Sequence, residues 1–196
     1  MSTLTVARKG GQIAIASDSL TTFDELKLPP GNDAAPEKIF AVETEHGPAF
    51  VGVVGYAAHF LVLQSALEAL GELDFSSRRG VFDTFHDLHP LLKEEFFLNP
   101  EAGEGDPYES SQITILIASP HGIYGVYDLR EVHAYRQFWA LGSGGDWALG
   151  AMWAAYDGAP SAEAVARRGI EAGVTFDRSS GGDAQVWTLE AATDGV

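Results

Sequence analysis

The first two residues of the chain could carry nucleophilic chemistry. The chain opens with Met1 and Ser2, and an initiator methionine that precedes a small residue is normally removed. Removal would leave Ser2 with both a hydroxyl and a free α-amine. Because an α-amine has a pKa of about 8, this one residue could supply a nucleophile and its own general base. Met-Ser is a common way for a protein to begin, so the rest of the chain must decide whether Ser2 acts.

Other residues suited to catalysis fall where the expected strands and helices end. Asp18 ends the second strand, Lys38 begins the third, and Gly55 ends the fourth directly before a helix. Ser143 lies in a glycine-rich turn before a helix, and the block Asp177-Arg178-Ser179-Ser180-Gly181-Gly182 lies between the last helix and the last strand. Rigid scaffolds commonly present their chemistry at strand ends and loops. Each residue alone is typical of a turn or a solvated strand end, so only their combination is informative.

The strands that must position these residues follow from the hydrophobic pattern. Residues 2–8 and 12–18 predict an antiparallel hairpin around Lys9-Gly10-Gly11. Residues 23–37 are rich in proline and predict a loop. Further strands are expected over 38–42, 49–54, 112–118, 122–127, 132–135 and 185–189, and Trp139-Ala140-Leu141 leads into the glycine-rich turn.

Four helices are expected between these strands. Apolar residues at helical spacing predict a helix through residue 70 and another over about 81–97, which Pro90 should kink or split. An acidic loop over 98–110 follows. A third helix is expected over about 146–156, and a fourth runs to about residue 173 with Ser161 as its N-cap.

The order of these elements indicates an α+β fold. Strands, two helices, strands, two helices and a strand do not alternate as βαβ units, which disfavours a doubly wound parallel sheet. Two antiparallel sheets stacked between two helix layers fit the order better. With 196 residues and no repeat or linker, the chain is expected to form one domain.

Composition excludes several classes of partner. Twelve basic against 28 acidic residues give a net charge of −16, so binding to nucleic acid or to an anionic membrane is not expected. The chain has no cysteine, which removes disulfides, cysteine-based zinc sites and thiol nucleophiles. We find no signal-peptide pattern and no apolar stretch long enough to span a bilayer, so a soluble, cytoplasmic protein is expected.

Taken together, the motifs resemble a known family. They are the hairpin that ends in Ala16-Ser17-Asp18-Ser19, then Lys38-Ile39, Val54-Gly55-Tyr56-Ala57-Ala58, Leu141-Gly142-Ser143-Gly144-Gly145 and the block 177–182. Over nearly its whole length the chain is similar to proteasome β-subunits and HslV-type N-terminal-nucleophile peptidases. It is most similar to the small bacterial proteasome homologues of β-proteobacteria. The resemblance implies that residues 1–196 form a single proteasome-like peptidase domain with a four-layer αββα fold.

The resemblance also implies roles for individual residues. The catalytic residues would be Ser2, Asp18, Lys38, Ser143, Asp177 and Ser180, and the substrate-binding residues would be Thr22, Val53 and Gly55. In these roles Ser2 attacks the peptide carbonyl, Lys38 favours its alkoxide, and the Gly55 N–H stabilises the oxyanion. No cofactor or metal is implied. The implied partners are identical subunits in stacked rings, a peptide or unfolded protein substrate, and an ATP-dependent unfoldase.

Three features differ from the family pattern. Ser2 stands where the family usually has threonine, and Thr3 follows it; if processing exposed Thr3 instead, the interval to Asp18 would be one residue short. Tyr56 follows Gly55 where a second glycine is common, and the loop before Lys38 is longer than in HslV. Two alternatives to a ring peptidase stay open: a subunit that assembles without activity, and an N-terminal-nucleophile amidase that acts on a small molecule.

Other candidate sites are weaker. His86 and His89 are three residues apart on an expected helix, but they lack a third ligand for zinc. The acidic loop over 98–110 lacks the alternating ligands of a calcium loop. The aromatic residues Tyr108, Trp147 and Trp153 could lie at subunit contacts.

Overall fold

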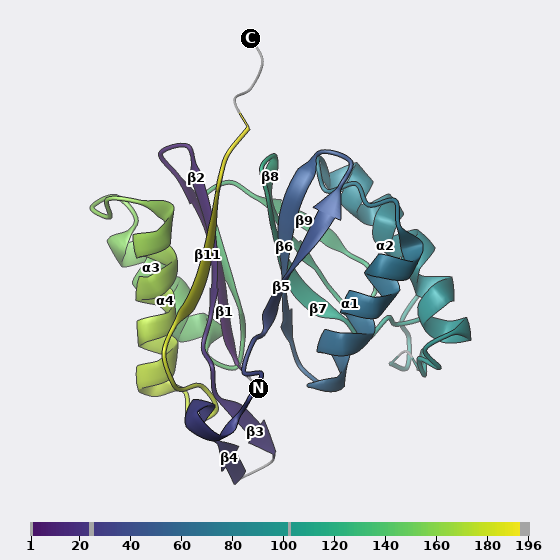
Figure 1. The fold of residues 1–196 in the computed structure, drawn as a ribbon, viewed down its shortest axis with the longest axis horizontal. Coiled ribbons are helices and arrows are strands. Elements are labelled where there is room, and N and C mark those ends of the chain that lie inside the picture. The colour runs from purple at the N-terminus through teal and green to yellow at the C-terminus, as the bar shows by residue number, and fades with distance from the viewer. Residues whose placement is uncertain (1, 24–25, 102, 193–196) are drawn as a thin grey trace.

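The computed structural model, which describes residues 2–23, 26–101 and 103–192, has four layers. Two antiparallel sheets lie face to face, and a pair of helices covers the outer face of each (Figure 1). The α+β, αββα architecture expected from the order of elements is therefore confirmed. Among the described residues, no helix has the length and hydropathy needed to cross a bilayer.

The first sheet has the strand order β10-β1-β2-β11. Its strands are β1 (Thr3–Lys9), β2 (Gln12–Ser17), β10 (Phe138–Gly142) and β11 (Gln185–Glu190). Helices α3 (Gly145–Ala155) and α4 (Ala162–Phe176) pack on its outer face. The Ser161 side chain accepts a hydrogen bond from the N–H of Ala164, so this residue caps α4 as the sequence predicts.

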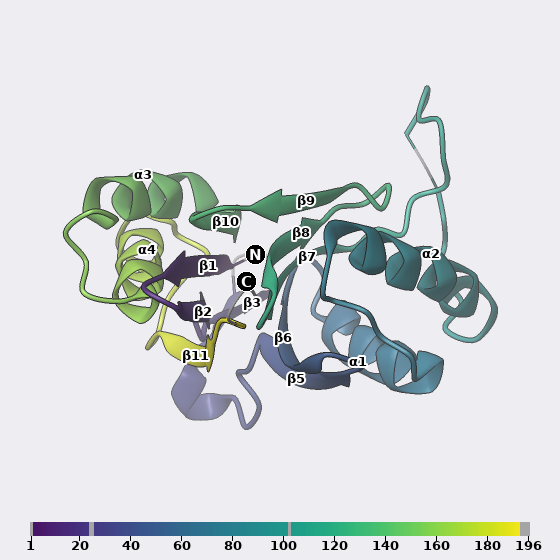
Figure 2. The same cartoon turned by 90° about the horizontal axis from the view of Figure 1, so that it is seen from above.

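The second sheet has the strand order β5-β6-β7-β8-β9. Its strands are β5 (Ile39–Thr44), β6 (Gly47–Val54), β7 (Thr114–Ser119), β8 (Gly122–Val126) and β9 (Val132–Tyr135). Helices α1 (Ala58–Leu70) and α2 (Arg78–Glu94) cover it. Seen from above, the loop between α2 and β7 projects beyond the helices (Figure 2).

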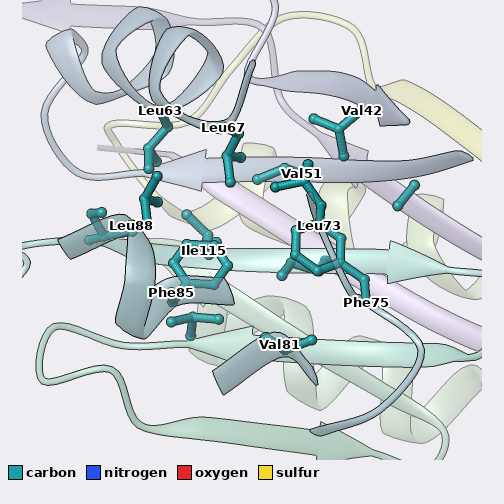
Figure 3. Packing of buried hydrophobic residues seen from close by; sticks show 14 of the residues in the cluster. Val42, Val51, Leu63, Leu67, Leu73, Phe75, Val81, Phe85, Leu88 and Ile115 are labelled. Atoms are coloured by element: carbon teal, nitrogen blue, oxygen red, sulfur yellow. The ribbon is translucent and has the colours of Figure 1, made fainter. Parts of the chain in front are cut away.

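Three apolar clusters hold the layers together. One lies between the second sheet and its helices, with Val51, Ile115, Leu67 and Phe85 among its members (Figure 3). A second joins the first sheet to α3 and α4, and a third fills the space between the sheets. The sheets approach closely at Gly52, where an added Cβ would lie 2.6 Å from Leu4 Cδ1. A larger residue at this position would force the sheets apart.

One expectation about local structure is wrong, and a second is wrong in part. The loop expected over 23–37 contains strand pairing: β3 (Thr21–Phe23) and β4 (Leu26–Leu28) form a short hairpin, followed by the 3-10 turn η1 (Pro30–Asn32). Strands of three residues are too short to give a clear alternating pattern, which is why proline content dominated the prediction.

Pro90 does not split α2, which continues from Arg78 to Glu94. Proline removes the hydrogen bond to the carbonyl four residues earlier, and here that residue is His86. Both His86 and Pro90 are on the exposed side of α2, where water can satisfy the freed carbonyl. The apolar face of α2 supplies the packing that keeps the helix continuous.

A buried histidine ties α2 to the loop that follows it. The two ring nitrogens of His89 form hydrogen bonds, Nδ1 with Ser111 Oγ at 2.8 Å and Nε2 with Glu109 Oε2 at 3.2 Å. Lys93 binds the same Glu109 carboxylate, and Arg130 donates to Ser111. Burial lowers the pKa of His89 below its ordinary value, and the positive charges of Arg130 and Lys93 act in the same direction against the opposing effect of Glu109.

This network predicts a loss of stability below neutral pH. Because the folded state holds His89 with a lowered pKa, the unfolded chain binds a proton first as the pH falls through about 6.5. The free energy of unfolding should therefore decrease between pH 7.5 and 6.0, measured by urea denaturation. His59, whose pKa is also lowered by burial, acts in the same direction, so the decrease should become smaller, not vanish, in His89→Gln. An equal pH dependence in the variant would contradict the prediction.

Candidate active site

A buried carboxylate brings together the segments around Ser2. Asp18 follows β2 and is fully buried. Its Oδ1 accepts hydrogen bonds from the Thr3 N–H at 3.0 Å and from Lys38 Nζ at 2.7 Å. Its Oδ2 accepts from the N–H groups of Leu20 at 3.3 Å and Gly181 at 2.9 Å. Four donors from separate parts of the chain therefore converge on one side chain.

Lys38 is held by these contacts directly before β5. Its ammonium also donates to the Leu20 carbonyl at 2.7 Å, and its side chain is only 12% exposed. Burial lowers the pKa of Lys38 below its ordinary value, although the charge and hydrogen bond of Asp18 oppose this effect. The result is a fixed positive charge with a weakened hold on its proton.

A second carboxylate collects hydroxyl groups. Asp177, the C-cap of α4, accepts hydrogen bonds at Oδ2 from Ser143 Oγ at 2.6 Å and from Ser180 Oγ at 2.7 Å. Partial burial raises the pKa of Asp177. These two hydrogen bonds and one from the Ser179 N–H lower the pKa by more than burial raises it, so the net pKa lies below its ordinary value. Ser180 Oγ also lies 2.7 Å from Thr3 Oγ1, which links the cluster to β1.

Ser2 lies directly before β1, next to Thr3, which forms hydrogen bonds with both clusters. Its carbonyl accepts a hydrogen bond from the Gly144 N–H at 3.4 Å. Gly142, at the end of β10, has a φ of +91°, and an added Cβ there would lie 2.0 Å from the Ser2 carbonyl oxygen. Only glycine fits this position, because the strand passes so close to the backbone of Ser2. Met1, whose removal the sequence predicts, lies outside the described residues.

A pocket of 360 Å³ opens beside Ser2. Its lining includes five residues that the sequence singled out, namely Ser2, Thr22, Lys38, Val53 and Gly55. Gly55 directly follows β6 and is exposed. Its φ of +103° is a conformation that favours glycine. Apolar side chains of Tyr56, Phe60 and Leu61 complete one wall. Such a pocket suits an apolar side chain of a ligand.

Thr3 occupies a different environment from Ser2. It is fully buried, and its side chain points toward Gly173 of α4, where an added Cβ would lie 2.2 Å from Thr3 Oγ1. Its hydroxyl is engaged with Ser180. Of these two residues, Ser2 lines the pocket and Thr3 does not.

The structure also places residues beside Ser2 that the sequence reasoning missed. A second pocket of 340 Å³ shares Ser2, Val54, Gly55 and Tyr56 with the first. It is also lined by Gln112, Thr114, Asp128, Gly142 and Ser143. Thr114 begins β7 and Asp128 lies in the turn after β8. Both residues are therefore at strand ends, and the same criterion that singled out Asp18 and Lys38 could have found them.

The weaker candidates from the sequence do not assemble into a site. His89 is buried and bound to Ser111 and Glu109, whereas His86 is exposed beside Asp87. Within residues 2–23, 26–101 and 103–192 no group of three or more metal-binding side chains is clustered. Tyr108, Trp147 and Trp153 are exposed by 66%, 53% and 78%.

The αββα layers, with Ser2 lining a pocket beside a buried Lys–Asp pair, are typical of N-terminal-nucleophile hydrolases. BPH of Thiobacillus denitrificans, a bacterial proteasome homologue, is 38% identical with a TM-score of 0.87, and the match covers 98% of this chain and all of that one. The same protein in complex with epoxomicin is 37% identical over 97% of this chain, with a TM-score of 0.86. Eukaryotic HslV from Trypanosoma brucei is 20% identical with a TM-score of 0.72 over 96% of this chain, which shows the shared fold.

No family sequence profile and no curated protein sequence matched the chain. The identity to BPH over the full chain nevertheless shows the family: the chain belongs to the bacterial proteasome homologues. It is a proteasome-type N-terminal-nucleophile peptidase subunit, of a family that typically assembles into rings. The resemblance stated from the motifs is thereby confirmed.

The convergence on Asp18 predicts a large stability effect. Asp18→Asn would leave the Lys38 ammonium buried without its counter-charge, and we expect the free energy of unfolding to fall by about 3–5 kcal/mol. Lys38→Met should also be destabilising, because it leaves the carboxylate without its cation. In a double-mutant cycle, the combined variant should lose less than the sum of the single variants. Additive losses in urea denaturation would show that the pair is not coupled.

Proposed function

We propose that Ser2, freed by removal of Met1, is the nucleophile of a serine-type peptidase. One observation carries this proposal: Ser2 lies where two pockets meet, and Lys38 lines one of them. Thr3, the alternative hydroxyl, is buried against α4 and bound to Ser180. The proposed domain is the single peptidase domain over residues 1–196.

The proposed reaction begins with attack of Ser2 Oγ on the carbonyl carbon of a peptide bond. The hydroxyl proton passes to the α-amine of Ser2, directly or through a water molecule. That proton then goes to the leaving amine as the C–N bond breaks, and the acyl group stays on Ser2 as an ester. Water attacks the ester, with the α-amine again relaying the proton, and releases the carboxylic acid product and free Ser2.

The surrounding residues have proposed roles in these steps. Lys38, fixed by Asp18, lowers the cost of forming negative charge on Ser2 Oγ. The Gly55 N–H donates to the oxyanion. Ser143, Asp177 and Ser180 orient the α-amine through hydrogen bonds. Their existing contacts, in which both hydroxyls bind one carboxylate, fit a group that holds a protonated amine.

The substrate is proposed to lie along β3. The Thr22 backbone would pair with an extended peptide, as in the addition of a strand to a sheet edge. Val53 would line the pocket for the residue before the cleaved bond, which together with Phe60 and Leu61 favours an apolar side chain. The related BPH binds epoxomicin, which supports a peptidase site in this chain.

We further propose that identical subunits form stacked rings in the cytoplasm, with the sites inside and an ATP-dependent unfoldase as partner. The exposed Trp147, whose ring lies 5.3 Å from that of Phe176, and the exposed Trp153 offer apolar surface for contacts between subunits. Sedimentation at hundreds of kilodaltons is expected for such a particle, whereas a small-molecule amidase would be a low-order oligomer.

Substitution of Ser2 tests the catalytic proposal. Intact mass should show loss of Met1, and Ser2→Ala should reduce cleavage of a fluorogenic peptide by about 10⁴-fold or more. Ser2→Thr keeps the hydroxyl and adds the methyl group that restricts rotation about χ1, so it should retain activity. Lys38→Ala should lower kcat by at least about 100-fold.

Two results would contradict the proposal. Retention of Met1 without turnover in a ring-sized particle would indicate an inactive assembly subunit. Undiminished cleavage by Ser2→Ala, together with an epoxyketone adduct on another residue, would place the nucleophile elsewhere. The exposed Asp157, in the turn after α3, provides a control variant, Asp157→Asn, that should match the wild type.

A further inference from the structure

Two pockets meet at Ser2, and they differ in character. Both are lined by Ser2, Val54, Gly55 and Tyr56. The first extends toward β3 and Lys38, and the second extends toward the start of β7 and the turn after β8. A peptide attacked at Ser2 must therefore have one pocket on each side of the cleaved bond.

The first pocket contains the β3 edge and the apolar wall that suit the acyl side of the substrate. The second pocket is then free for the substrate residues that follow the cleaved bond and are released with the leaving amine. We propose that the second pocket binds the residue following the cleaved bond, and that Asp128 gives it a preference for a basic side chain. This inference rests on the proposed peptidase function and specifies its substrate.

The charge in this pocket comes from one carboxylate. Apart from the α-amine that processing would expose on Ser2, Asp128 is the one charged group among the described residues of the lining. Thr114 Oγ1 donates to Asp128 Oδ1 at 2.8 Å, and the Asp128 main-chain carbonyl accepts from the Ser111 N–H at 2.7 Å. The carboxylate is therefore held in place at the pocket wall.

Among the described residues, no cation pairs with this carboxylate. In the part of the chain that the structure describes, no lysine, arginine or histidine nitrogen lies within 4.0 Å of it. Arg130 in the same turn donates instead to Ser111 and to the Glu109 carbonyl. Burial lowers the pKa of the nearby His59 against the opposing effects of Gln112 and Asp128, which disfavours a positive charge there. An arginine or lysine of the substrate would supply the missing counter-charge.

The remaining lining suits a long basic side chain. Tyr56, which is 71% exposed, presents an aromatic ring between the two pockets. Gln112 and Ser143 add polar groups to the walls. The aliphatic stem of a lysine or arginine can lie along the Tyr56 ring while its charged end reaches a carboxylate.

The test is a set of internally quenched peptides that differ only in the residue after the cleaved bond: Arg, Lys, Gln, Leu or Glu. Mass spectrometry confirms the cleaved bond in each. For the wild-type assembly, kcat/KM should be about two- to fivefold higher for Arg than for Gln, the range expected for an exposed ion pair. The ratio should fall toward one as the salt concentration rises.

Variants of Asp128 decide whether this residue causes the preference. In Asp128→Asn, whose side chain can still accept from Thr114, the Arg-to-Gln ratio should fall to about one. In Asp128→Lys, the Glu peptide should become the better substrate. Asp157→Asn removes an exposed carboxylate far from the pocket and should keep the wild-type ratio.

Two kinds of failure are distinguishable. Cleavage that depends on Ser2 but shows equal Arg-to-Gln ratios in the wild type and Asp128→Asn would overturn this inference and leave the peptidase proposal intact. A wild type that cleaves none of the peptides would overturn the proposed function, and this inference with it.

Discussion

A carboxylate with no access to solvent must have its charge met by the protein, since an unpaired buried charge costs several kcal/mol. Asp18 meets this requirement with two backbone donors beside β1 and β2, one from the loop before β11, and the Lys38 ammonium. These donors are far apart in the sequence. Satisfying one carboxylate therefore fixes the relative positions of the opening hairpin, the start of the second sheet and the 177–182 block. The location of Ser2 follows from that arrangement.

Close backbone approaches complete the placement of Ser2. The start of β1 passes within contact distance of Gly142 of β10 and Gly173 of α4, where side chains would collide with Ser2 and Thr3. Thr3 is thereby held between the sheet and α4, with its hydroxyl directed away from the pockets. The alternation of a strand then turns the preceding residue toward the opposite side. The same packing that buries Thr3 leaves Ser2 at the junction of the two pockets.

The sequence predicted what strong local patterns encode. The order of strands and helices indicated the four layers, and the Ser161 cap and the strand-end positions of Asp18, Lys38 and Ser143 were visible as motifs. The β3–β4 hairpin was missed because three-residue strands have no readable period. The split expected at Pro90 does not occur, because the carbonyl that loses its hydrogen bond is on the exposed side of α2, and the sequence pattern does not show this. Asp128 and Thr114 were missed because the second pocket is formed by segments that become neighbours only when β6, β7 and β8 pair.

Three carboxylates near Ser2 illustrate how environment divides the work of one residue type. Asp18 is buried and bound to a lysine, so its charge is neutralised inside the protein and serves to position other groups. Asp177 is partly exposed and binds two serine hydroxyls, which leaves its negative charge free to hold a nearby amine. Asp128 is exposed, lines the second pocket beside Ser2 and has a threonine hydroxyl as its side-chain partner. A carboxylate attracts the cation that can reach it. Asp18 therefore binds a lysine of the protein, Asp177 would bind the N-terminal amine, and Asp128 would bind a basic side chain of the substrate.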